Sequence, residues 1–204
     1  MSEAVKEKTG PDLGKFKPYP AYKDSGVEWL GEVPEHWDAY RLKHIVSINM
    51  GQSPPSDFYN TDGDGVPFLQ GNAEFGIKHP SHKYWCSYAM KIAQPGDLLL
   101  SVRAPVGEIN TADKIYAIGR GLCSLTSGDA IDKGYLWYAM AIFREGLFYA
   151  TTGSTYDGIS IYDLKNLLVV IPPVCEQNKI TYFLNEKTAK IDALIAKQER
   201  LIEL

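Results

Sequence analysis

The hydrophobic positions between residues 21 and 175 fall into short runs separated by turn residues. Six such runs predict strands, at residues 45–48, 66–70, 98–102, 115–118, 122–125 and 167–171. Residues 62–65 (Asp-Gly-Asp-Gly) and 95–97 (Pro-Gly-Asp) have the composition of turns. The pattern predicts a mixed domain in which strands dominate.

Residues 133–150 follow a different pattern, which predicts a helix in the middle of this domain. Apolar side chains surround its axis nearly completely, so we expect the helix to be buried. They are Tyr135, Leu136, Trp137, Ala139, Met140, Ile142, Phe143, Leu147 and Phe148. We expect Asp129 or Asp132 to cap its N-terminus.

Residues 176–204 predict a second long helix. Pro172 and Pro173 end the preceding strand, and Glu176 lies in the first helical turn, where the dipole favours an anion. Apolar residues then alternate at spacings of four and three, interrupted by Lys187 and Gln198, as in a coiled coil. The residues expected to form a dimer seam are Ile180, Leu184, Ile191, Leu194, Ile195 and Leu201.

Two interpretations of this last helix stay open from the period alone. The helix can fold back on its own domain, or it can pair with another helix, because an apolar face stabilises a helix only when it is buried. About 29 residues with a rise of about 1.5 Å each span roughly 43 Å. That length favours a partner helix.

These patterns together predict an α+β fold with three parts. A mixed, mostly β domain at residues 21–175 is followed by a protruding helix at residues 176–204. Residues 1–20 contain Gly10, Pro11, Gly14, Pro18 and Pro20 and no apolar period, which predicts a flexible N-terminal segment.

The composition is that of a soluble globular protein. Of the 204 residues, 45% are hydrophobic and 23% are charged, which excludes a disordered or collagen-like chain. No apolar run reaches the length of about 18 residues that a membrane span needs, and the N-terminus has no signal-peptide pattern. Three widely spaced cysteines do not indicate a disulfide framework, so we expect a cytoplasmic protein.

Three segments resemble, in their order and spacing, the specificity subunit of type I restriction-modification systems. The first is residues 24–37 (DSGVEWLGEVPEHW) followed by residues 41–43 (RLK). The second is residues 171–180, which contain Ile-Pro-Pro at residues 171–173, Glu-Gln at residues 176–177, and Ile180. The third is residues 190–203 (KIDALIAKQERLIE).

The resemblance implies a function in sequence-specific DNA recognition. Members of the family carry two target-recognition domains, each followed by a long helix, and the two helices pack antiparallel as a spacer. Each domain reads half of a bipartite site, modification subunits with methyltransferase chemistry dock on the helices, and restriction subunits join the assembly. This chain resembles half of such a subunit, and two copies could restore the whole as a two-fold homodimer.

Recognition of DNA requires donors that reach base edges and phosphates, and such side chains concentrate in loops. Any one of the candidates can be an ordinary surface residue, but the resemblance implies that some of them meet DNA. The candidates are Gln70, Asn72, Lys78, His79, Lys83, Tyr84, Arg103, Arg120, Ser154, Thr155 and Tyr156.

The formal net charge of −4 opposes DNA binding. Residues 1–38 carry 8 acidic and 5 basic side chains, whereas residues 39–175 carry 12 and 11, so the acidity is concentrated near the N-terminus. Because binding to DNA depends on neutralising phosphates, we expect the isolated chain to bind weakly and the methylating partner to supply much of the affinity.

Catalytic and cofactor-binding patterns are absent from the sequence. The Pro-Pro pairs of residues 53–56 and 171–174 lack the aromatic residue that DNA amino-methyltransferases place after them, and no glycine-rich loop is suited to S-adenosylmethionine. We therefore expect a subunit that is not an enzyme and holds no cofactor. We expect Trp29 and Trp37 to pack the N-terminal arm onto the core.

Three other interpretations are weaker. Asp97 and Glu108 could serve a metal-dependent nuclease, but Asn110 stands where such a spacing would carry a lysine. His79, His82 and Cys86 have ligand-like spacing but no fourth ligand, so we expect no metal site, and a buried Cys86. The third alternative is a degenerate scaffold fragment that binds partner proteins but not DNA.

Overall fold

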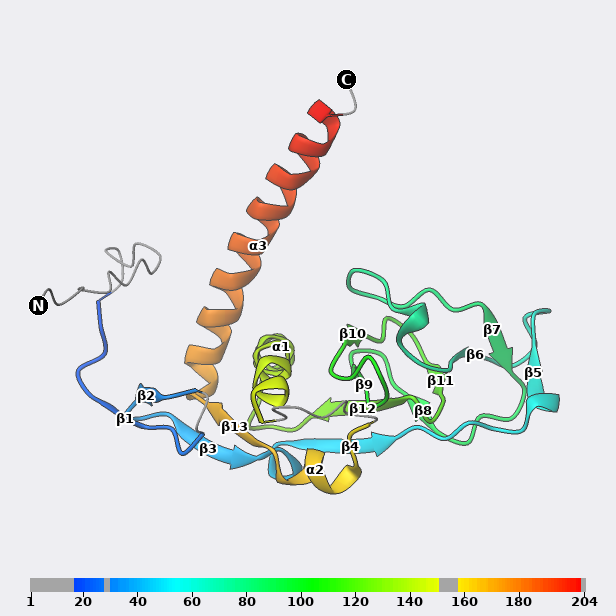
Figure 1. Cartoon of the computed structure of the whole chain (residues 1–204), viewed down its shortest axis with the longest axis horizontal. Helices are drawn as coiled ribbons and strands as arrows, with labels where there is room; N and C mark the ends of the chain where they lie inside the picture. Colours follow the sequence, from blue (N-terminus) through cyan, green and yellow to red (C-terminus); the bar gives the residue numbers. More distant parts are fainter. Residues whose placement is uncertain (1–16, 28–29, 151–157, 203–204) are drawn as a thin grey trace, which may run out of the picture.

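The computed structural model describes residues 17–27, 30–150 and 158–202. A sheet-rich domain extends to one side of α3 (Val174–Ile202), a long helix that rises away from it (Figure 1). This is the α+β architecture expected from the sequence. The helix begins two residues earlier than expected, because the carbonyl oxygen of Pro173 already accepts the amides of Glu176 and Gln177.

A four-stranded antiparallel sheet forms the centre of the domain, in the order β10-β9-β12-β4. Its strands are β4 (Val46–Met50), β9 (Leu98–Ser101), β10 (Ile109–Thr111) and β12 (Leu122–Ser127). Leu98 and Leu100 face one core and Leu99 faces another, because successive side chains of a strand point to opposite faces. Burial on both faces explains why residues 98–100 are three consecutive leucines.

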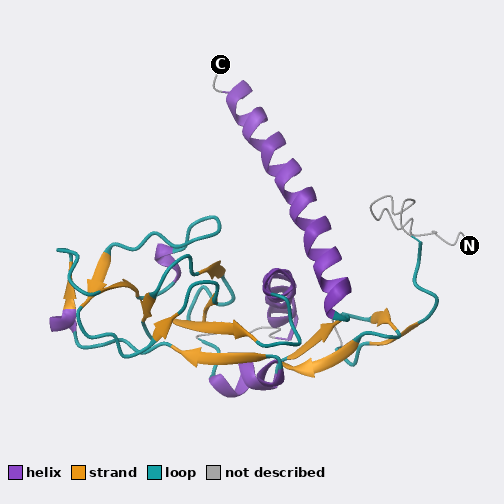
Figure 2. Ribbon diagram, turned by 180° about the vertical axis from the view of Figure 1, so that it is seen from behind, coloured by secondary structure: helices purple, strands orange, loops and turns teal. Residues whose placement is uncertain are grey.

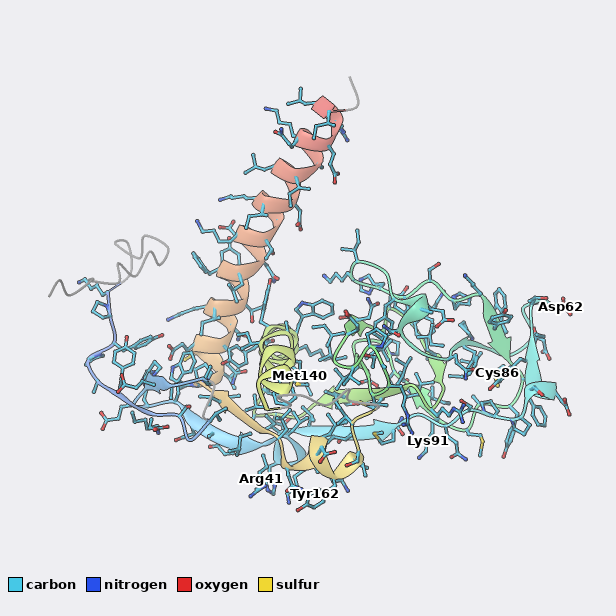
Figure 3. All side chains as sticks on the ribbon, viewed as in Figure 1. Arg41, Asp62, Cys86, Lys91, Met140 and Tyr162 are labelled. Atoms are coloured by element: carbon cyan, nitrogen blue, oxygen red, sulfur yellow. The ribbon has the colours of Figure 1, made fainter. Side chains whose placement is uncertain are left out.

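The first of these cores lies under α1 (Lys133–Ala150), which has the bounds expected from the sequence. Asp132 is the capping residue, since its Oδ1 accepts the Tyr135 amide at 2.9 Å. Leu136 and Met140 are buried members of this core, and Figure 3 labels Met140 on the helix. Ile142 is 52% exposed, so the expectation of burial all round was wrong: one side of the helix faces solvent.

The second core joins the central sheet to a mixed five-stranded sheet in the order β5-β7-β6-β11-β8. This outer sheet places β6 and β11 parallel, and its distal end carries Asp62 and the buried Cys86 (Figure 3). Its strands are β5 (Tyr59–Asn60), β6 (Val66–Leu69), β7 (Tyr84–Cys86), β8 (Ile92–Ala93) and β11 (Tyr116–Ile118).

Two small antiparallel pairs lie at the base of α3 (Figure 2). One joins β1 (Tyr22–Asp24) to β2 (Glu32–Pro34), and the other joins β3 (Asp38–Arg41) to β13 (Leu168–Ile171). Trp37 packs against the small core between them, as expected, whereas Trp29 lies outside the described residues. The remaining short helices are α2 (Ile161–Asn166), η1 (Leu42–His44), η2 (Ser56–Phe58) and η3 (Asn72–Glu74).

Gln177 fastens α3 to the domain from the helix's first turn. Its side chain is completely buried. Its Nε2 donates to the carbonyl oxygens of Ala130 at 2.9 Å and Pro172 at 2.8 Å, and its Oε1 accepts the Asp132 amide at 2.7 Å. The amide group therefore links the start of α3 to the loop before α1 and to the end of β13.

Glu176 forms a second attachment at the same turn. Its carboxylate accepts hydrogen bonds from the Tyr19 hydroxyl and, at 3.3 Å, from Trp37 Nε1, and it lies 2.8 Å from His36 Nε2. Burial alone would raise the pKa of Glu176, but these hydrogen bonds outweigh it and hold the pKa below its ordinary value. Tyr19 thus contacts α3, although it belongs to the segment expected to be flexible.

The upper part of α3 stands clear of the domain, and its side chains project into solvent (Figure 3). Ile191, Leu194 and Ile195 are more than half exposed. Ile180, in contrast, is partly buried and packs against the main core, which separates it from the exposed residues of the expected seam. Within the described ranges, no helix combines the length and apolarity needed to cross a bilayer.

Replacing Gln177 with Ala should destabilise the domain by about 3 kcal/mol, because two carbonyls and one amide would lose their buried partner. Gln198→Ala, on the exposed part of the same helix, is the matched control and should change stability by no more than about 0.5 kcal/mol. Urea unfolding followed by far-UV circular dichroism measures both. Equal effects of the two substitutions would contradict the role given to Gln177.

The Glu176 attachment should make stability depend on pH in the acid range. Since the folded-state pKa lies below the ordinary value of 4.5, the stabilisation is complete above that value and is lost as the pH falls through the folded pKa. On going from neutral pH to about pH 3, the free energy of unfolding should therefore fall less in Glu176→Gln than in the parent. Glu199→Gln, exposed on α3, should retain the parent's dependence. Parallel unfolding curves at the two pH values test this.

Candidate nucleic-acid interface

Loops at the ends of three strands enclose a polar hollow of about 550 Å³. The segments that line it are residues 70–72 after β6, residues 103–104 after β9, and residues 120–121 between β11 and β12. Its polar side chains are those of Gln70, Asn72, Arg103 and Arg120. Gln70 and Arg120, 50 positions apart in the sequence, thus lie on one surface.

Two glycines allow the Arg120 loop to approach the Gln70 loop. A Cβ at Gly121 would lie 2.7 Å from the Gln70 carbonyl oxygen, and a Cβ at Gly119 would lie 3.1 Å from the Gln70 Cα. The Gly119 amide donates to the Leu69 carbonyl at 2.8 Å, and the Arg120 amide donates to Ser53 Oγ at 3.1 Å. These bonds hold the backbone of Arg120 at the rim of the hollow.

Arg103 is positioned by the end of β9. The Val102 amide donates to the Gly121 carbonyl at 2.9 Å, which ties the Arg103 segment to the Arg120 segment. Arg103 also forms a β-bridge with Gly158, where a Cβ would lie 3.1 Å from Arg103 Cδ. The chain leading to α2 therefore passes directly beside the hollow.

The hollow is rich in hydrogen-bond donors, and its side-chain acceptors are the neutral amide oxygens of Gln70 and Asn72. Both arginines are exposed, and no carboxylate occurs among the described residues that line it. A guanidinium group pairs with the O6 and N7 acceptors of guanine, and the amides of Asn and Gln pair with adenine in the major groove. The arrangement fits an electron-rich ligand such as a base edge or a phosphate.

Four other candidates lie away from this hollow. Lys78 borders a separate cleft of about 800 Å³ between α1 and α3, and His79 Nδ1 lies 2.9 Å from the Thr111 carbonyl oxygen. Lys83 and Tyr84 are exposed at the start of β7 in the outer sheet. The remaining three candidates, Ser154, Thr155 and Tyr156, lie outside the described residues.

The spacing of His79, His82 and Cys86 does not produce a metal site in the described part of the chain, where no cluster of three potential ligands occurs. Cys86 is fully buried, as expected. The ring of His82 packs against Trp85 and Tyr116. Burial, with a smaller contribution from Lys114, lowers the pKa of His82. These ring contacts assign His82 a packing role.

The Asp97 carboxylate, which the nuclease interpretation requires, makes hydrogen bonds within the fold. Asp97 is buried, its Oδ2 accepts the Gln94 amide at 2.9 Å, and its Oδ1 accepts the Thr126 hydroxyl at 2.8 Å. Asn110 is also buried and donates to the Gly76 carbonyl. Asp97 therefore closes a turn and fastens it to β12, and the nuclease interpretation has no support in this geometry.

Sequence reasoning missed the residues that shape the hollow. Ser53 entered the sequence analysis only beside a Pro-Pro pair, and Gly158 was not among the expected contact residues. The Gly-Arg-Gly sequence at residues 119–121 was a usable signal, since glycines on both sides of an arginine indicate close backbone approach. No local pattern identifies Ser53, whose partner lies 67 residues away.

Comparison with known proteins is consistent across sequence and structure. The family model of the type I restriction modification DNA specificity domain matches residues 34–204. A putative type I restriction enzyme MjaX specificity subunit of Methanocaldococcus jannaschii is 37% identical over 169 residues, which cover 81% of this chain and 39% of that protein.

Solved structures give the same answer. The HsdS subunit from Thermoanaerobacter tengcongensis superposes with a TM-score of 0.75 and 38% identity, over 87% of this chain and 42% of that one. A chain from a structure of type I R-M complex assembly and conformational transition gives a TM-score of 0.72 and 41% identity, over 79% and 40% of the two chains. The chain spans about two fifths of the length of these relatives. It belongs to the type I restriction modification DNA specificity domain family.

Proposed function

We propose that this chain reads one half of a bipartite DNA target within a type I restriction-modification assembly. The observation that carries the proposal is the convergence of Gln70, Asn72, Arg103 and Arg120 on one hollow. These are four of the residues expected to contact DNA, and they come from three separate loops. Their chemistry is that of direct base readout in the major groove.

Positioning rather than bond chemistry is the mechanism that we propose. The strands fix the loop ends, the loops present guanidinium and amide donors, and the base sequence that offers matching acceptors binds most tightly. Methylation and cleavage belong to modification and restriction subunits in the cytoplasm, and the chain needs no cofactor for its own part. Four of the eleven expected contact residues, Lys78, His79, Lys83 and Tyr84, lie outside the hollow. In this proposal they contact the phosphate backbone of DNA or do not contact DNA.

The exposed apolar stripe of α3 supports the second part of the proposal, in which the helix pairs with another helix and positions two recognition domains. Ile191, Leu194, Ile195, Leu201 and Ile202 are each more than half exposed to solvent, and such a stripe is stabilised when another helix covers it. A second copy of the chain offers the same stripe, so a two-fold dimer would cover both. The pair of helices would then hold two recognition domains at a set distance and provide the surface on which modification subunits dock.

Loss of either arginine should weaken specific DNA binding. Arg103→Ala and Arg120→Ala should each reduce affinity by about 5- to 150-fold, which corresponds to the 1–3 kcal/mol of a bidentate base contact. The duplex is selected from a randomised pool by the assembly with its modification subunits, and affinity is measured by fluorescence anisotropy over a salt series. The isolated chain should bind weakly at physiological salt because of its net charge of −4.

Lys91→Ala is the control for this experiment, since Lys91 is an exposed cation of the same domain outside the hollow. Its replacement should lower affinity for all duplexes by a similar small factor. If the arginine variants behave like Lys91→Ala, the hollow does not read bases. Retained partner binding without any sequence preference would instead favour a scaffold.

Placing charges on the apolar stripe should separate a dimer into monomers. Ile191→Glu combined with Leu194→Glu should halve the mass measured by light scattering, because two carboxylates would be buried without partners. Ala193→Glu introduces the same side chain beside the stripe and should leave the mass unchanged. A parent chain that is already monomeric would contradict the homodimer.

A further inference from the structure

A polar seam on α3 faces α1 and is separate from the apolar stripe. It consists of Gln177, Thr181 and Asn185, which are spaced by four and so lie on one side of the helix. Thr181 Oγ1 donates to Asp132 Oδ1 at 3.3 Å. Asn185 Oδ1 accepts the Tyr138 hydroxyl at 2.9 Å. With the three bonds of Gln177, the seam connects two full turns of α3 to the domain.

The two helices approach closely at the middle of the seam. A Cβ at Gly134 would lie only 2.3 Å from Thr181 Cγ2, well inside van der Waals contact. Gly134 lies in the first turn of α1, where glycine lowers helix stability relative to alanine. The absence of a side chain at this position therefore has a packing role: it allows α3 to reach the Asp132 carboxylate.

The seam fixes the direction in which the apolar stripe points. At 3.6 residues per turn, the exposed residues Ile191, Leu194 and Ile195 are rotated from the seam by roughly a quarter turn. One side of α3 is thus bound to its own domain while another side remains available. Hydrogen bonds are directional, so the seam resists both rotation and tilt of the helix, which apolar packing alone would resist less.

We propose that Gln177, Thr181 and Asn185, with Gly134 opposite them, are positioning residues that set the spacing between two DNA half-sites. The inference rests on the proposed function, because it assumes a second recognition domain beyond the helix. A displacement of about 1 Å at Thr181, roughly 6 Å along the axis from Gln177, becomes about 5 Å at Lys197, roughly 30 Å along it. Successive nucleotides of one strand are about 3.4 Å apart, so this change exceeds one base pair.

Gly134→Ala tests the seam by inserting one methyl group between the helices. Spin labels on Asp62→Cys and Lys197→Cys, with Cys175→Ser to remove the exposed native thiol, report the distance from the distal end of the domain to the upper helix. Pulsed electron paramagnetic resonance should show a shift of about 5 Å in Gly134→Ala. Adding Thr181→Ser should restore the parent distance, because serine lacks the clashing methyl group but keeps the hydroxyl.

Two further variants control for helix stability and for the outer end of the seam. Ala141→Gly changes helix propensity at an exposed position of α1 and should leave the distance unchanged. Tyr138→Phe removes the hydrogen bond to Asn185 and should broaden the distance distribution. An unchanged distance in Gly134→Ala, or a shift that Thr181→Ser does not reverse, would overturn the proposal.

The functional measurement uses duplexes in which two selected half-sites are separated by spacers that increase one base pair at a time. Gly134→Ala should move the preferred spacer by one or more base pairs while the affinity for a single half-site stays within about twofold of the parent. Arg103→Ala should weaken the affinity for a single half-site and leave the preferred spacer unchanged. A changed half-site preference in Gly134→Ala would contradict a positioning role. If the parent selects no half-site, the proposed function fails, whereas the spin-label distances still decide whether the seam sets the direction of α3.

Discussion

The side-chain amide of Gln177 is the interaction on which the rest of this structure depends. A buried amide is costly unless its donors and acceptor are paired, and here it joins three separate backbone segments. Apolar packing would keep α3 near the domain, but it would permit many rotations of similar energy. The amide makes one rotation preferable. A domain that recognises a base sequence can act at a distance from a second domain only if that orientation is unique.

Local pattern was sufficient to predict the two long helices and six of the thirteen strands in the described residues. The six expected strands all occur, and α1 has the predicted bounds, because both follow from short-range period and turn composition. The period could not show that Ile180 belongs to the domain core or that Ile142 is exposed. Those outcomes depend on where α3 crosses α1, and that crossing is decided by long-range contacts such as Gln177 with Ala130.

The candidate site was predictable only in part, for a similar reason. Loop position and donor chemistry identified Gln70, Asn72, Arg103 and Arg120 together with residues that lie elsewhere. Which of them converge depends on how β6, β9 and β11 are ordered between the two sheets, and sequence alone does not give that order. The parallel pairing of β6 with β11 places the Gln70 and Arg120 loops at the same end of the outer sheet. Glycines at positions 119 and 121 then permit direct backbone contact.

The acidic net charge and the cationic hollow are compatible because they act on DNA over different distances. Attraction to the polyanion over long distances follows the net charge, and it is screened beyond roughly 10 Å at moderate salt. Direct contact follows the local arrangement of donors, which in this hollow includes two arginines and no carboxylate among the described lining residues. Under the proposed function, a chain with this charge distribution contributes little to general attraction and more to discrimination between sequences. The proposal then assigns the general affinity to partner subunits, and the orientation of α3 sets where the domain meets the DNA that those partners hold.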